Sequence, residues 1–323
     1  MIAVIRLLRL LGWIVLCTPL QSVLLPLGTP LSKRLPHIFH RGCCRILGLD
    51  VQLWGERSRE RPTLFICNHT SYLDIVALGG VLPGSFVAKQ EVRSWPLFGY
   101  LSRLQRTVFV ERRRDTTVKH RDEMVERLEA GDNLILFPEG TSNDGNRVLP
   151  FKTAFFGVAE KPVRGKPLSV QPISIAYTKL NGIPMGRRYR PYYAWYGDMD
   201  LASHLFEMAG LGRATVVVEC HPPVTIEQFK NRKELAAHCE RVIAEGVARA
   251  VGGRLEGRVI RGRGMRRLAA AARARARASA GGLLDRMASG KANLAARGPN
   301  DERRSAPQAP QPAPPGQNEP GKG

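Results

Sequence analysis

The chain has 323 residues, enough for a full hydrophobic core in one large domain or two small ones. Its 49 Lys and Arg outnumber its 28 Asp and Glu, so the net charge is +21 and we expect an anionic partner or surface. Its six cysteines form no Cys-x-x-Cys pair and no Cys/His zinc spacing. This pattern argues against a metal site and against a disulfide-stapled secreted domain, and favours reduced, buried thiols.

Residues 1–48 are predicted to anchor the chain to a membrane. Between Arg9 and Lys33 lie 23 residues without a charge, which as one helix would span about 34 Å. Pro19 and Pro26 interrupt this run, and basic residues flank it on both sides, so the positive-inside rule gives no direction. We expect a bent or paired-helix anchor on the cytoplasmic face of the cell membrane, with a single span as the alternative.

Residues 49–252 show apolar strand-like segments that alternate with helical patterns. The predicted strands are 51–54, 63–67, 85–88, 107–110, 133–137, 168–176 and 214–220. The predicted helices are 74–80, 117–129 and 233–250. Such alternation predicts an α/β domain with a central, mostly parallel sheet flanked by helices.

The last segment, residues 253–323, is predicted to be a largely disordered tail. From residue 252 onward the chain carries 15 Lys and Arg against 5 Asp and Glu, first in an Arg/Ala-rich stretch and then among Pro, Gly and Gln. Because the opposite end of the chain is expected at a membrane, we assign this tail to the anionic membrane surface rather than to nucleic acid.

His69 and Asp74 form the first motif that carries chemistry, in the sequence Asn-His-Thr-Ser-Tyr-Leu-Asp. The two residues follow the predicted strand 63–67. A carboxylate beside a histidine fixes the imidazole tautomer and stabilises the imidazolium that forms when the ring takes a proton. Five residues on one helix would place the side chains about 140° apart, so we expect His69 in a turn and Asp74 in the first turns of the next helix. A helix-capping turn with a solvated Asp74 is the alternative.

The second motif follows the predicted strand 133–137 and reads Pro138-Glu139-Gly140-Thr141-Ser142. Proline stops the strand, and glycine allows the backbone to approach a ligand closely. Glu139 is therefore expected at the end of a strand, facing whatever binds there, with an ordinary solvated turn as the alternative.

Taken together, Asn-His-x4-Asp and Phe-Pro-Glu-Gly-Thr resemble the motifs of the glycerolipid acyltransferases, the family of 1-acyl-glycerol-3-phosphate acyltransferases. Residues 106–112 and 170–175 resemble two further blocks of this family, and the four blocks occur in family order over about residues 60–220. The resemblance implies transfer of an acyl group from acyl-CoA or acyl carrier protein to the free hydroxyl of a lysolipid, without a cofactor.

The resemblance also implies how the reaction proceeds. His69 is the general base on the lysolipid hydroxyl and Asp74 orients its ring, so that the hydroxyl attacks the thioester directly. Cys67 and Ser71 are the neighbouring nucleophiles, but Cys67 is expected to pack in the core and Ser71 to cap a helix, so no acyl-enzyme is expected.

The same resemblance implies the binding residues. Arg112 matches the family's arginine for the anionic headgroup of the acceptor, since guanidinium binds phosphate bidentately. Glu139, Gly140 and Thr141 help hold the acceptor; for Glu139 we expect a contact with the glycerol hydroxyl or with a basic residue. Lys89 is a candidate for a second headgroup contact or for a phosphate of the donor, with an ordinary surface lysine as the alternative.

Two departures from the family concern the acceptor. Glu111 stands where aspartate is expected, and the residues after Thr141 read Ser-Asn-Asp-Gly-Asn-Arg. That stretch resembles a variant within the superfamily that acylates lyso-ornithine lipid. Lysophosphatidate is the first choice of acceptor and lyso-ornithine lipid the alternative. A hypothesis of another class is a catalytically inactive, membrane-tethered lipid-binding protein.

Overall fold

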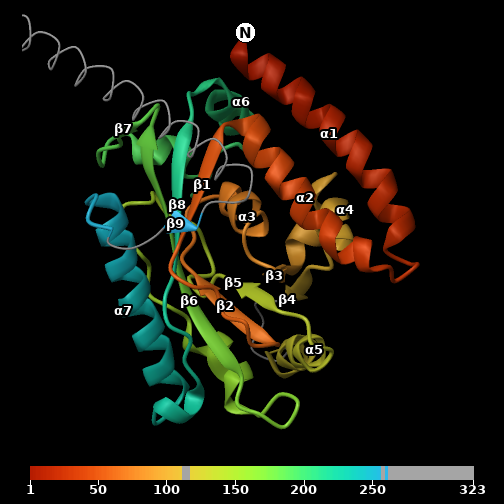
Figure 1. Cartoon of the computed structure of the whole chain (residues 1–323), viewed down its shortest axis with the longest axis vertical. Coiled ribbons are helices and arrows are strands. Elements are labelled where there is room, and N and C mark those ends of the chain that lie inside the picture. The colour runs from red at the N-terminus through yellow and green to blue at the C-terminus, as the bar shows by residue number, and fades with distance from the viewer. Residues whose placement is uncertain (111–116, 256–258, 261–323) are drawn as a thin grey trace, which may run out of the picture. The chain divides into compact units, whose positions relative to one another are not determined.

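The computed structural model describes residues 1–110, 117–255 and 259–260, which belong to one compact unit, Met1–Ile260. In this part of the chain, nine strands form a mixed, mostly parallel sheet with helices on both faces, the fold class expected from the sequence (Figure 1). The strands are β1 (Leu49–Trp54), β2 (Thr63–Cys67), β3 (Ser85–Lys89), β4 (Val108–Val110), β5 (Leu134–Leu136), β6 (Ser169–Leu180), β7 (Ile183–Pro184), β8 (Ala214–Cys220) and β9 (Val259–Ile260).

The order of the strands places β2 near the middle of the sheet, as β4-β3-β5-β2-β6-β8-β1-β9, with β7 paired to β6. The five strands from β4 to β6 run parallel to one another. β8 is antiparallel to β6, and β1 is parallel to β8. The carboxyl ends of β2 and β5 therefore meet at one edge of the sheet, where both sequence motifs begin.

The helices cover the two faces of this sheet. They are α1 (Ile2–Leu24), α2 (Pro30–Leu47), α3 (Tyr72–Gly79), α4 (Phe98–Leu104), α5 (Thr117–Glu129), α6 (Leu201–Gly210) and α7 (Arg232–Val251), with 3-10 turns η1 (Gln90–Ser94), η2 (Thr153–Glu160), η3 (Arg190–Tyr193) and η4 (Ile226–Gln228). Side chains of α2, α3 and α6 pack on one face, and those of α5, η2 and α7 on the other. Figure 1 shows α7 and α3 on opposite sides of the sheet.

Strand β2 shows why both faces need a helical cover. Phe65 and Cys67 point into the core under α3, whereas Leu64 and Ile66 point into the core under α7. All four side chains are fully buried, and such burial contributes about 1.5–3 kcal/mol for each large apolar side chain. A central strand of a mostly parallel sheet is apolar throughout for this reason.

Most predicted strands and helices begin and end within two residues of the observed ones. β6 is the main exception, because it continues from the predicted end at residue 176 to Leu180 and pairs there with β7 and β8. The short helices α4 and α6 were not predicted. The tail predicted for residues 253–323 lies largely outside the described residues; within it, β9 pairs antiparallel with β1.

The N-terminal helix α1 differs from the expectation that Pro19 interrupts it. α1 continues through Pro19 to Leu24 and packs against α2 and α6. Its last turns are held because the side-chain amide of Gln21 donates to the carbonyls of Ser32 (2.9 Å) and Leu104 (3.1 Å). These contacts offset the backbone hydrogen bond that the proline cannot make. α1 and α2 thus pack as a pair of helices, and the anchoring of this pair in a membrane stays a prediction.

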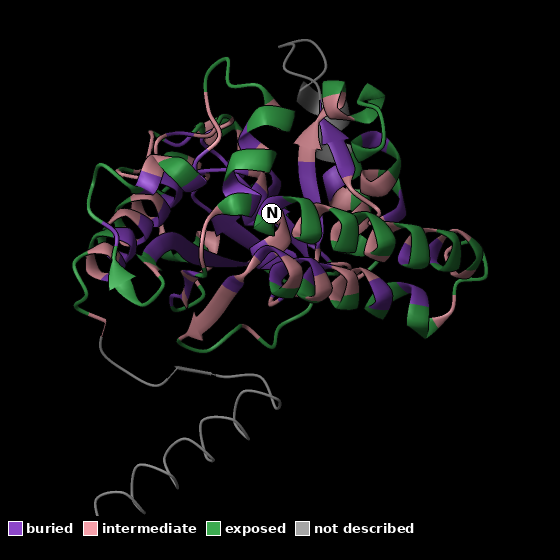
Figure 2. Cartoon of the chain, turned by 90° about the horizontal axis from the view of Figure 1, so that it is seen from above, coloured by how far each residue is buried: buried purple, intermediate pink, exposed green. Residues whose placement is uncertain are grey.

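Helix α1 is also the only helix in the described part of the chain that is long and apolar enough to cross a membrane, by length and composition alone. Figure 2 shows most of its residues exposed, in contrast to the buried strands of the sheet. Near its start, Arg6 donates to the carbonyls of Ala209 (3.2 Å) and Leu211 (2.6 Å) beside the end of α6. Its middle is held by Trp13, whose indole N–H donates to the carbonyl of Phe39 at 3.0 Å.

Candidate active site

His69 lies in the loop between β2 and α3, and Asp74 lies in the first turn of α3, as the spacing predicted. The side chain of Ser71 caps α3 by accepting from the backbone N–H of Leu73, and Asp74 closes a capping box by accepting from the backbone N–H of Ser71. The cap turns the carboxylate back toward the loop. Nδ1 of His69 therefore lies 3.0 Å from Oδ2 of Asp74.

Asp74 is held in one position by four donors. Oδ2 accepts from the His69 ring and from the backbone N–H groups of Thr70 (2.6 Å) and Ser71 (2.9 Å). Oδ1 accepts from the hydroxyl of Tyr177 on β6 at 2.9 Å. The carboxylate is fully buried, so these bonds replace the water that it loses on folding.

The His69 ring is fixed from a second side by an aromatic contact. It stacks on Phe137, the residue directly after β5, with ring centroids 4.2 Å apart and planes 19° apart. Because the carboxylate of Asp74 only accepts, Nδ1 carries the ring hydrogen and Nε2 is the acceptor nitrogen. The side chain is 21% exposed, so Nε2 can take a proton from a bound molecule while Asp74 stabilises the imidazolium.

Glu139 connects the second motif to the first. It is 2% exposed, and its Oε1 accepts from the backbone N–H of His69 at 2.8 Å. Its Oε2 accepts from the side-chain amide of Asn143 (2.8 Å) and the backbone N–H of Leu149 (3.0 Å). Burial raises the pKa of Glu139 to about 7, although these hydrogen bonds and the neighbouring His69 ring act to lower it. Both oxygens thus hold the His69 loop and the 143–149 segment together.

Three further residues support the site and were not recognised for that role in the sequence. Asn143 also donates from its amide to the carbonyl of His69 at 3.1 Å. Asn68 makes two bonds with the backbone of Ile175 on β6, at 2.8 and 2.9 Å, so its amide acts like a strand partner. Tyr177 lies one residue beyond the predicted strand, where nothing in the sequence marks it. The sequence did offer a pointer to Asn143, because this residue lies in the stretch after Thr141 that departs from the family's pattern.

A cavity of about 550 Å³ lies against His69. Lys89 at the end of β3 lines it, as do Gly140, Thr141 and Ser142 of the second motif, so the structure gathers these predicted residues around one space. The remaining walls come largely from apolar side chains of α1, α2, α3, α4 and β3. Such a space fits a hydrocarbon chain whose reactive end lies at His69.

The predicted binding residues occupy different places. Thr141 is exposed and Lys89 half-buried, both at the cavity, whereas Glu139 lies behind His69 and does not line it. Gly140 has φ +67°, a backbone conformation that residues with a Cβ rarely adopt, so the turn needs glycine. Arg112 lies outside the described residues.

The neighbouring nucleophiles are not available for chemistry. Cys67 is fully buried, and burial raises the pKa of its thiol well above the ordinary value. Ser71 is fully buried and its hydroxyl caps α3. Among the described residues, no group of three or more His, Cys, Asp or Glu side chains could hold a metal ion. The arrangement therefore favours direct attack by an external hydroxyl that His69 activates.

The sequence is similar to known proteins over most of this unit. The acyltransferase family model matches residues 50–176. The chain is 46% identical over 226 residues to a lyso-ornithine lipid O-acyltransferase of Brucella abortus (strain 2308), covering 69% of this chain and 85% of that protein. It is 42% identical over 244 residues to a protein of the same name from Rhizobium meliloti (strain 1021), covering 74% and 82%. A 1-acyl-sn-glycerol-3-phosphate acyltransferase of Neisseria gonorrhoeae is 36% identical over 177 residues, covering 54% and 64%.

Proposed function

The chain belongs to the acyltransferase family, and we propose that it transfers a fatty acyl group to the free hydroxyl of lyso-ornithine lipid. The imidazole of His69, oriented by a buried carboxylate beside an apolar cavity, is the observation that carries acyl transfer. The choice of acceptor follows the names of the relatives. Two relatives that are 46% and 42% identical to this chain are named lyso-ornithine lipid O-acyltransferases, whereas the 1-acyl-sn-glycerol-3-phosphate acyltransferase is 36% identical over a shorter stretch. This preference reverses our choice from the motifs, which placed lysophosphatidate first.

The proposed reaction has two steps at one centre. Nε2 of His69 takes the proton of the lipid hydroxyl as its oxygen attacks the thioester carbonyl, and Asp74 stabilises the imidazolium. The tetrahedral intermediate then expels the thiolate, which receives the proton from His69. The products are the diacyl lipid and the free thiol of the donor. General-base catalysis of this kind contributes about 10²–10⁴-fold, and the donor is acyl-CoA or acyl carrier protein without a further cofactor.

The loop after Thr141 offers charges of both signs for a zwitterionic headgroup. Asp144 lies between Asn143, which donates to the carbonyl of His69, and Gly145, where an added Cβ would lie 2.9 Å from the side chain of Thr70. The ornithine headgroup carries an ammonium and a carboxylate where lysophosphatidate carries a phosphate. We assign Asp144 to the ammonium.

Arginines surround this carboxylate. Partial burial raises the pKa of Asp144, but hydrogen bonds from Asn146 and the charges of Arg147 and Arg187 outweigh it and hold the pKa below the ordinary value. Asp144 is thus ionised at neutral pH. The two arginines are available for the headgroup carboxylate, which guanidinium recognises bidentately.

The lipid substrate requires access from a membrane, and α1 offers that contact. Large apolar side chains are exposed along its length, including Leu8, Val15, Leu16 and Val23. Because Arg6 and Gln21 tie α1 to the rest of the unit, we propose that it lies in one leaflet of the cytoplasmic face with these side chains among the lipid tails. The basic residues of the tail would add attraction to anionic lipid.

The test is a competition between acceptors. Purified full-length protein in detergent micelles receives labelled acyl-CoA or acyl carrier protein, with lyso-ornithine lipid and lysophosphatidate at equal concentration. We expect diacyl ornithine lipid as the main product. Asp144→Asn should lower kcat/KM for lyso-ornithine lipid about tenfold and leave lysophosphatidate nearly unaffected, as a lost charged hydrogen bond predicts. Preferred acylation of lysophosphatidate by the wild type would overturn the assignment of the acceptor.

A further inference from the structure

The apolar cavity beside His69 has polar atoms in one part of its wall. Among the described residues, seven buried side-chain atoms have no hydrogen-bond partner, and three of them belong to this wall: Oγ1 of Thr18 and Oε1 of Gln21 on α1, and Nδ1 of His40 on α2. All three residues line the cavity. Burying a polar atom without a partner is unfavourable, and an apolar side chain of similar size would avoid this in a wall that only contacts hydrocarbon.

Gln21 is held with its amide oxygen unpaired. The residue is 5% exposed, and its amide nitrogen uses both hydrogens, to the carbonyls of Ser32 on α2 and Leu104 at the end of α4. These two bonds prevent the amide from turning to seek another partner for its oxygen. Thr18 lies about one helical turn earlier on the same face of α1, and it lines the same cavity.

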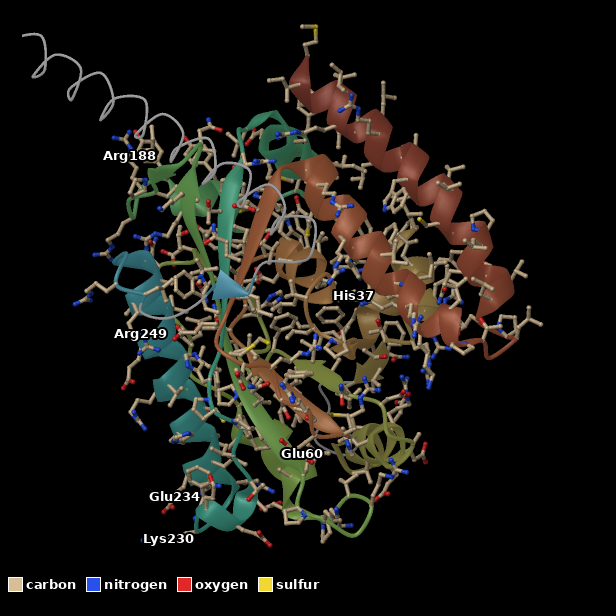
Figure 3. The ribbon with its side chains drawn as sticks, viewed as in Figure 1. His37, Glu60, Arg188, Lys230, Glu234 and Arg249 are labelled. Atoms are coloured by element: carbon tan, nitrogen blue, oxygen red, sulfur yellow. The ribbon has the colours of Figure 1, made fainter. Side chains whose placement is uncertain are left out.

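His40 is equally fixed. It is 5% exposed, and an added Cβ on Gly79 of α3 would lie 2.5 Å from its ring, so the ring packs closely against that helix. The neighbouring His37, labelled in Figure 3, donates from Nδ1 to the carbonyl of Gly79 at 2.8 Å and holds α2 against α3. Burial lowers the pKa of His40 to about 4, although a hydrogen bond with the side chain of Gln105 acts to raise it, so the ring is neutral at pH 7 and Nδ1 is its unpaired nitrogen.

A row of rings connects these atoms with the reacting centre. His69 stacks on Phe137 at 4.2 Å, Phe137 on Phe86 at 6.1 Å, and Phe86 meets His40 edge-on at 6.3 Å, measured between ring centroids. All four rings line the cavity. A hydrocarbon chain whose carbonyl carbon lies at His69 therefore reaches the polar atoms several carbons further along.

We propose that this part of the cavity, between α1, α2 and the end of α4, binds a hydroxyl group carried on the hydrocarbon chain of a substrate. A hydroxyl donates one hydrogen bond and accepts up to two, which matches the amide oxygen of Gln21 with the hydroxyl of Thr18 and the neutral ring of His40. The site would select a hydroxylated fatty chain over an unsubstituted one. The inference rests on the proposed acyl transfer and adds a preference between chains to it.

Matched lipids test this preference. In one arm, acyl-CoA donors of a single length carry a hydroxyl at successive positions, and the acceptor is unsubstituted except for its reacting hydroxyl. In the other arm, the extra hydroxyl moves along the acceptor's chain and the donor is unsubstituted. We expect kcat/KM to rise about tenfold for one position in one arm, because a site with unpaired polar groups disfavours the chain that lacks the hydroxyl.

Variants assign the preference to these atoms. Thr18→Val and Gln21→Leu should bring the ratio between hydroxylated and unsubstituted chains toward one. Ser22→Ala is the matched control on the same helix: its hydroxyl bonds the carbonyl of Thr18 and the hydroxyl of Tyr100, and Ser22 does not line the cavity, so the ratio should persist. Melting temperatures establish that each variant is folded.

No preference at any position in either arm would overturn the inference, as would a preference that survives both variants. The proposed function is judged separately, by whether the wild type acylates lyso-ornithine lipid with an unsubstituted donor. An active wild type without chain preference would leave that function intact and remove this site.

Discussion

Replacing Asp74 with Asn removes one negative charge beside His69 and hardly changes the volume of the side chain. An amide oxygen in the place of Oδ2 still accepts from the His69 ring and from the backbone of Thr70 and Ser71, and the amide nitrogen then donates to the oxygen of Tyr177. All four hydrogen bonds to the carboxylate change from charge-assisted to neutral, at about 1 kcal/mol each. The variant should therefore fold, with a loss of about 4 kcal/mol in the free energy of unfolding.

The substitution should raise the activation barrier of the reaction by at least as much as it lowers the free energy of unfolding. In the wild type the imidazolium forms 3.0 Å from the carboxylate, and at an effective dielectric constant of about 20 such a pair is worth about 5 kcal/mol. The neutral amide does not supply this attraction when the proton moves to Nε2. A barrier higher by about 4–5 kcal/mol lowers kcat by about 10³- to 10⁴-fold.

The assay is the initial rate of labelled diacyl product at saturating donor and lyso-ornithine lipid, for the wild type and Asp74→Asn in the same detergent. Circular dichroism and melting temperature report whether the variant is folded. A folded variant whose kcat lies within tenfold of the wild type would refute the role of the carboxylate in stabilising the imidazolium.

Two further variants test the residues that support the site. Tyr177→Phe leaves Oδ1 of Asp74 without a partner in a buried site, so the free energy of unfolding should fall by about 1–3 kcal/mol, and an unchanged melting temperature would contradict this. For Glu139, folding raises the carboxyl pKa from 4.5 to about 7, so the native state binds the proton more tightly. Stability should fall as pH rises from about 4.5 to 7, by about 3 kcal/mol from this group. Glu139→Gln should lose that dependence, which melting temperatures at pH 5 and pH 8 measure. If the stability of the wild type and of Glu139→Gln depended equally on pH, the raised pKa of Glu139 would be ruled out as the cause.

The sequence predicts the central strands well because their burial leaves little choice of residue. β2 is apolar at every position between two helical layers, and such a run bounded by polar turns is recognisable without the structure. His69 and Asp74 were predictable together because a short loop and a helix cap fix their geometry locally, through bonds that span at most five residues.

Contacts between distant segments left no comparable signal. Tyr177 reaches Asp74 across the sheet, 103 residues away in the chain, and only the pairing of β2 with β6 brings the two together. For the same reason, the bonds from Gln21 to α2 and α4 could not be foreseen, and the helix was expected to break at Pro19. The sequence thus predicted the pair of His69 and Asp74, whose geometry is local, but not the contacts from distant segments that hold the site in place.

Removal of the His69 side chain is the most direct test that its Nε2 is the base. In His69→Ala, Asp74 keeps three of its four donors, so the loop and α3 should stay folded. We predict that the rate of diacyl ornithine lipid formation falls by at least about 10²-fold while the melting temperature shows a folded protein. A folded His69→Ala protein that makes this product within tenfold of the wild-type rate would contradict the mechanism.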